Sequence, residues 1–77
     1  MLFLIEYDRP SGQIVSFRAF DNSHTSKADD ARLDLELGLR KQGIEREVVL
    51  LEAPSEDALR ITHSRYFKNL SELMRAL

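Results

Sequence analysis

The sequence contains no cysteine among its 77 residues. Disulfide scaffolds, thiolate zinc sites and thiol nucleophiles are therefore excluded. Long apolar runs are also missing: the run at the N-terminus, Met1 to Ile5, is too short for a signal peptide or a membrane span. The sequence thus predicts a cytoplasmic protein, of a bacterial kind, without membrane contact.

Excess charge of either sign is also missing. The chain has 11 basic and 13 acidic residues, a formal net charge of −2, which is not the electrostatic signature of a general nucleic-acid binder. Apolar residues make up 43% and charged residues 31%, a globular composition that argues against intrinsic disorder. A chain of this length has room for one domain, residues 1–77.

Two alternating segments, 2–8 and 14–20, predict a hairpin of β-strands. Pro10 presets φ for a turn, and Gly12 can adopt the left-handed conformation that closes a three-residue loop. This loop places Tyr7 opposite Val15, so that one face collects Phe3, Ile5, Tyr7, Val15, Phe17 and Ala19. The other face then holds four apolar side chains, Leu2, Leu4, Ile14 and Phe20.

Residues 27–42 predict a helix that Ser26 and Asp29 begin as a capping box and that Gly43 ends. Leucines at every second position from 33 to 39 would also suit a strand, but the segment has no β-branched residue. A third strand is expected over 47–52. A second helix follows, capped by Ser55 and running to about residue 63 or 65, and a last helix begins after Asn69.

These elements predict an α+β fold in the order ββαβαα. The right-handed crossover rule favours a three-stranded antiparallel sheet of order 2-1-3. We expect the helices on one face of this sheet. The third strand then lies at an edge, where apolar residues promote association unless they are paired or covered.

A basic and aromatic run without an acidic residue spans residues 60–68. One interpretation is a site for a small anion or a nucleic-acid segment, made by Arg60, His63, Arg65, Tyr66 and Lys68. The simpler interpretation is structural: cations suit the C-terminus of a helix, and the aromatic residues anchor the connector in the core. The sequence favours the structural interpretation.

The sequence has few residue patterns that could form a catalytic, metal-binding or nucleotide-binding site. His63 lies between Thr62 and Ser64, but adjacent helical residues point about 100° apart and cannot act on one another. No histidine spacing fits a metal site, and the polar connector 23–27 lacks the glycines of a nucleotide loop. We therefore predict no catalytic residues, no metal and no cofactor, and keep a hydrolase or nuclease subunit using His63 as a minor alternative.

The sequence has more apolar surface than one small chain can cover. On a helix, Leu33 and Leu37 lie opposite the stripe that faces the sheet. Chains of this size rarely stabilise themselves by one core alone. We therefore predict a homodimer, an interaction or regulatory module, whose interface is drawn from Leu2, Leu4, Ile14, Phe20, Leu33, Leu37 and Val49.

Overall fold

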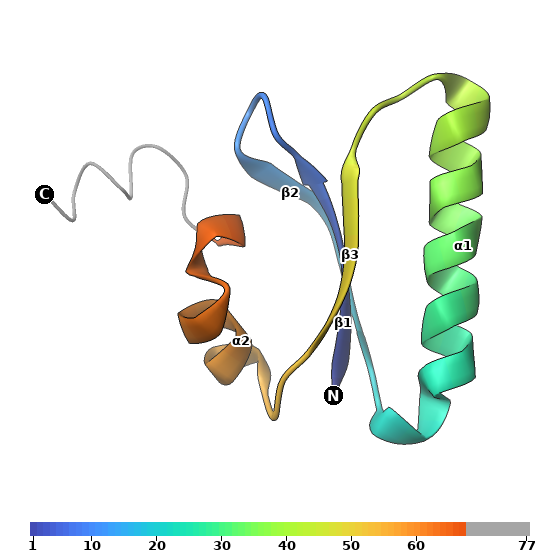
Figure 1. Ribbon diagram of the computed structural model, residues 1–77. Helices are drawn as coiled ribbons and strands as arrows, with labels where there is room; N and C mark the ends of the chain where they lie inside the picture. Colours follow the sequence, from blue (N-terminus) through green and yellow to red (C-terminus); the bar gives the residue numbers. More distant parts are fainter. Residues whose placement is uncertain (68–77) are drawn as a thin grey trace, which may run out of the picture.

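The computed structural model describes residues 1–67 and shows a three-stranded antiparallel sheet of order β2-β1-β3 (Figure 1). The elements are β1 (Leu2–Asp8), β2 (Gln13–Phe20), α1 (Thr25–Gln42), β3 (Glu47–Glu52) and α2 (Glu56–Thr62), with 3-10 turns at Asn22–His24 and Ser64–Tyr66. The predicted class and strand order are confirmed. The helix predicted after Asn69 lies outside the described residues.

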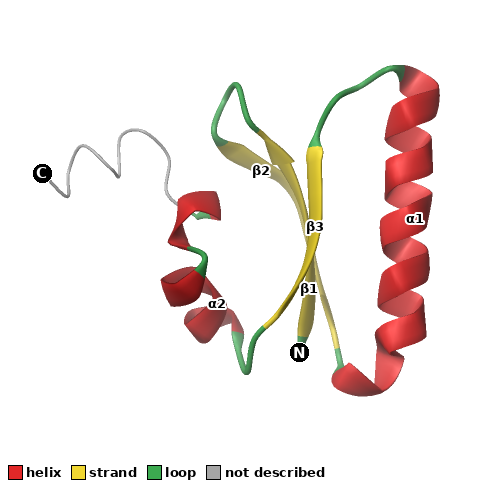
Figure 2. Cartoon of the chain, in the orientation of Figure 1, coloured by secondary structure: helices red, strands yellow, loops and turns green. Residues whose placement is uncertain are grey.

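The two α-helices lie on opposite faces of the sheet (Figure 2), so the prediction of helices on one face is wrong. α2 and the following turn cover the face that carries Phe3 and Ile5. α1 lies over the other face, where Leu4 is buried. The reason is that the central strand β1 is apolar on both faces, and each apolar face of a sheet needs its own cover.

The hairpin closes differently from the prediction. Gly12 has a φ of 67°, as predicted, and its N–H donates to the Asp8 carbonyl at 2.8 Å. Asp8 pairs with Gln13, however, and Tyr7 lies opposite Ile14. A β-bulge at Val15 then restores the predicted register further along the strands, where Ile5 pairs with Phe17.

The bulge changes which side chains face the core. Val15, predicted to lie opposite Tyr7, is 50% exposed. Ile14, predicted on the face of Leu2 and Leu4, instead packs against the cluster that α2 covers. These two predictions are wrong because one extra residue in a strand exchanges the faces of the residues beside it.

Replacing Gly12 by valine is expected to lower the free energy of unfolding by about 1 kcal/mol, because a β-branched residue resists a positive φ. Urea unfolding followed by circular dichroism measures this loss. Gly38→Ala is the control: a Cβ there meets no atom within 4 Å, and helical alanine is favoured over glycine. Equal stability of the wild type and the Gly12→Val variant would contradict the account of the turn.

Helix α1 begins at Thr25, before the predicted start. His24 occupies the N-cap without a side-chain hydrogen bond, so the predicted cap by Ser26 is wrong. The side chain of Asp21 instead caps the preceding 3-10 turn by accepting from the Ser23 N–H at 3.2 Å. The C-terminus agrees with the prediction, because Gly43 has a φ of 68° and the Ile44 N–H donates to the Leu39 carbonyl at 2.9 Å.

The main core lies between the sheet and α2. Its largest fully buried side chains are Phe3, Ile5 and Leu59. The rings of Tyr7 and Tyr66 meet edge to face with centroids 5.0 Å apart. Ser55 caps α2 as predicted: its hydroxyl accepts from the Ala58 N–H at 3.1 Å. α2 and the turn after it bring Arg65 and Tyr66 to Glu47 at the start of β3.

Candidate functional site

Two arginines from distant parts of the chain meet at Glu47, the first residue of β3. Nη2 of Arg9, from the hairpin loop, lies 2.6 Å from Oε1 of Glu47. Nη2 of Arg65, from the turn after α2, lies 2.9 Å from Oε2. The Glu47 side chain is 10% exposed, whereas those of Arg9 and Arg65 are 74% and 62% exposed. Glu47 is therefore the inner member of an ionic cluster at the surface.

The hydroxyl of Tyr66 belongs to the same cluster and accepts a hydrogen bond from Arg65. The Tyr66 hydroxyl and then the hydrogen-bonded Arg9 lower the pKa of Glu47 below its ordinary value. Burial, and next the Glu47 carboxylate, raise the pKa of Tyr66. At neutral pH the cluster therefore holds an ionised carboxylate beside a protonated phenol.

The rest of the basic run is also engaged inside the chain. The guanidinium of Arg60 stacks on the Phe67 ring at 4.6 Å and lies 3.9 Å from the Glu56 carboxylate. Tyr66 is buried, and His63 is half-buried at the end of α2. Lys68 lies outside the described residues. These contacts are those of the structural interpretation, and an anion site at residues 60–68 stays a prediction.

A second ionic cluster, which was not predicted from the sequence, lies on the face covered by α1. Glu6 of β1 is 7% exposed and accepts a hydrogen bond from the Ser16 hydroxyl at 3.1 Å. Nε of Arg46 lies 3.3 Å from Oε2 of Glu6, and its Nη1 lies 3.8 Å from Oδ1 of Asp8. Glu6, a glutamate inside an otherwise apolar strand, was the sequence signal for a buried ion pair. Its partner Arg46 could not be predicted, because the pairing of β1 with β3 brings the two residues together.

The histidines, carboxylates and hydroxyls within residues 1–67 form neither a metal site nor a histidine–hydroxyl pair fit for nucleophilic chemistry. Residues 1–67 contain no group of three or more histidine, aspartate or glutamate side chains placed to hold a metal ion. The Thr62 hydroxyl, beside His63, donates to the Ala58 carbonyl at 3.1 Å. No helix within these residues has the length and apolar character needed to cross a membrane.

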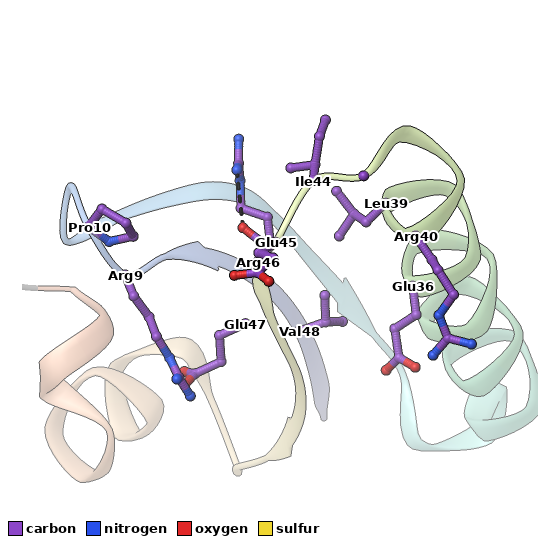
Figure 3. A pocket seen from close by; sticks show the side chains of 11 residues that line it. Arg9, Pro10, Glu36, Leu39, Arg40, Ile44, Glu45, Arg46, Glu47 and Val48 are labelled. Atoms are coloured by element: carbon purple, nitrogen blue, oxygen red, sulfur yellow. Dashed lines mark hydrogen bonds and ion pairs between the residues drawn. The ribbon is translucent and has the colours of Figure 1, made fainter.

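A hollow of about 880 Å³ lies at the start of β3, between the hairpin loop and the end of α1 (Figure 3). Leu39, Ile44 and Val48 give it an apolar floor. Its charged rim has both signs and consists of Arg9, Glu36, Arg40, Glu45, Arg46 and Glu47. Because β3 is an edge strand, this hollow opens where the sheet ends.

The predicted interface residues separate into two groups. Leu4 is 3% exposed beneath α1 and Ile14 faces the α2 side, so the sheet face predicted to be open does not exist. Leu2 and Phe20, which pair with each other, are half-buried at one end of that covered face, and Val49 is half-buried against the core. Leu33 and Leu37 are 49% and 51% exposed on the outer side of α1, as the two-stripe pattern predicts.

Comparison with protein families, with curated proteins and with solved structures finds no match for the chain. The class of the protein is therefore defined by its own fold: a small α+β domain whose sheet is covered on both faces and whose β3 edge borders an open hollow.

Proposed function

We propose that the chain is a small cytoplasmic interaction module without catalytic chemistry of its own, which self-associates as a homodimer. The observation that carries this proposal is the apolar pair Leu33 and Leu37, one helical turn apart and each about half exposed. The side of α1 that includes the fully buried Ala28 already packs in the fold. A second apolar stripe on such a helix is typical of association.

The small core supports the same proposal. Within residues 1–67, the large side chains that are fully buried are Phe3, Ile5 and Leu59. With no cysteine, the chain has no disulfide to supplement this core. A second subunit is the support that natural domains of this size commonly use.

Light scattering after size-exclusion chromatography is expected to give about twice the chain mass of 8.9 kDa at micromolar concentration. Changing both Leu33 and Leu37 to glutamate should give the mass of one chain with an unchanged helical spectrum. Ile61→Glu is the control, because Ile61 is 78% exposed on α2, across the sheet from α1. A wild-type chain that stays monomeric at millimolar concentration would overturn the proposal.

A further inference from the structure

β3 is the edge of the sheet best suited to pair with another strand. Its outer side has no neighbouring strand within the described residues. The segment between its terminal glutamates, 48–51, is wholly apolar and has no lysine or proline, the residues that block pairing at natural edges. The opposite edge, β2, is interrupted by the bulge at Val15 and carries the exposed Arg18. A bulge and a charge both discourage pairing.

Symmetry restricts how β3 can pair with its own copy. A two-fold axis perpendicular to the sheet leaves each side chain on its original face, so residues of the same face lie opposite each other. The axis must then pass midway between the two copies of one β3 residue, and the central candidates are Val48, Val49 and Leu50. An axis at Val48 places Arg46 opposite Leu50, and an axis at Leu50 places Glu52 opposite Val48.

An axis at Val49 gives the complementary register. Val48 lies opposite Leu50 of the second copy, and Arg46 lies opposite its Glu52, once at each end of the paired segment. Glu47 lies opposite Leu51, but its carboxylate is already paired within its own chain with Arg9 and Arg65. Glu52 is exposed and belongs to no ion pair among residues 1–67, while the Arg46 side chain keeps 27% exposure beside Glu6. Opposite charges directly across two strands stabilise their pairing, whereas a charge opposite an apolar residue does not.

Helix α1 extends the same surface. Its flank beside β3 carries Glu36 and Arg40, which line the hollow with Val48 (Figure 3). The two-fold axis brings a second α1 alongside in antiparallel orientation, so that each copy presents an acid and a base to the other. Leu33 and Leu37 precede these residues by three positions and therefore lie next to them on the helix surface.

The inference that follows rests on the proposed self-association and defines its geometry. We infer that two copies join through their β3 strands, antiparallel and centred on Val49, into one continuous sheet with both α1 helices side by side on one face. The partner that this edge fits is a second copy of the chain. The exposed leucines of α1 and the apolar edge strand are then parts of a single interface.

Disulfide trapping tests the register, because the chain has no cysteine of its own. Residues directly opposite in an antiparallel pair have Cβ atoms about 4.5–5.5 Å apart, close to disulfide reach. Mild oxidation of the Val49→Cys variant is expected to give a covalent dimer on a non-reducing gel. Val15→Cys, on the other edge strand, is the control and should stay a single chain.

The outcomes separate this inference from the proposed function. A dimeric mass with no cross-link at position 49 would overturn the β3 pairing and leave the homodimer standing. A chain that is monomeric at millimolar concentration would overturn both. Cross-linking through Val15→Cys in place of Val49→Cys would assign the interface to β2 and overturn the inference.

A charge reversal gives a second test that leaves the core untouched. Glu52→Lys places two like-charged pairs at the ends of the paired segment, and we expect the dimer Kd to rise about tenfold. Asp57→Lys makes the same charge change at an exposed position of α2, across the sheet from α1, and should leave the Kd unchanged. Equal Kd values for the Glu52→Lys variant and the wild type would overturn the Val49 register.

Discussion

The Tyr66→Ala variant is expected to lose about 3 kcal/mol of unfolding free energy, as large aromatic truncations in cores do. Tyr66 is 5% exposed and belongs to the core beneath α2. Its ring meets Tyr7 edge to face and lies under the guanidinium of Arg65 at 4.1 Å. Removing the ring therefore leaves a cavity where the turn after α2 docks onto β1.

Urea unfolding measures this loss, and two control variants separate the contribution of the ring from those of the hydroxyl and of the Arg65 ion pair. Tyr66→Phe keeps the ring and removes the hydroxyl, so its cost should be near 1 kcal/mol. Arg65→Ala removes an exposed ion pair, and such pairs contribute at most about 1 kcal/mol. A Tyr66→Ala variant no less stable than Arg65→Ala would contradict the structural interpretation of the basic run and return it to anion binding.

The topology could be predicted because its signals are local. Alternation of apolar residues marked β1 and β2, Ser55 marked the start of α2, and Gly43 marked the end of α1. The crossover rule then left one favoured strand order. The packing of α1 and α2 on opposite faces of the sheet could not be predicted in this way. Both faces of β1 are apolar, and the choice depends on how residues 53–55 turn the chain.

The hairpin shows how a correct local signal can give a wrong register. Gly12 has the predicted conformation, yet the structure combines the loop 9–12 with a bulge at Val15. A three-residue loop without a bulge aligns Phe3 and Ile5 with the same partners. The two solutions differ at the loop end of the hairpin, at Tyr7 and Asp8, and Ile14 replaces Val15 as the core residue beside Tyr7. Alternation along the strand alone does not distinguish them.

The ionic cluster at Glu47 could not be predicted from the sequence, for a different reason. Its members come from the hairpin loop, the start of β3 and the turn after α2, separated by 38 and 18 residues. Each looks like an ordinary surface charge in its own segment. Only the packing of α2 on the face that carries Phe3 and Ile5 brings Arg65 and Tyr66 to Glu47.

Glu47→Gln is expected to cost about 1–2 kcal/mol at pH 7, because the variant loses the charge that two arginines and the Tyr66 hydroxyl face. The high exposure of both arginines keeps this value at the low end for charged hydrogen bonds. Added salt should reduce the cost further, since it screens the exposed members of the cluster.

The stability lost in the Glu47→Gln variant is also expected to depend on pH. The pKa of Glu47 is lowered in the folded chain, first by the Tyr66 hydroxyl and then by Arg9, so the ionised form stabilises the fold. That contribution is complete above the ordinary carboxyl pKa of about 4.3 and is lost as the pH falls through the lower folded value. The stability difference between wild type and the Glu47→Gln variant should therefore shrink from pH 7 to about pH 3.

Urea unfolding of both proteins at several pH values in this window measures the difference directly. Glu45→Gln is the matched control, since Glu45 is an exposed neighbour on the rim of the hollow and contributes no side-chain ion pair among residues 1–67. Its stability should follow that of the wild type at every pH. A difference at Glu47 that stays constant down to pH 3 would show that its side chain stabilises the fold by packing, because a contribution from charge must vanish once the carboxylate is protonated.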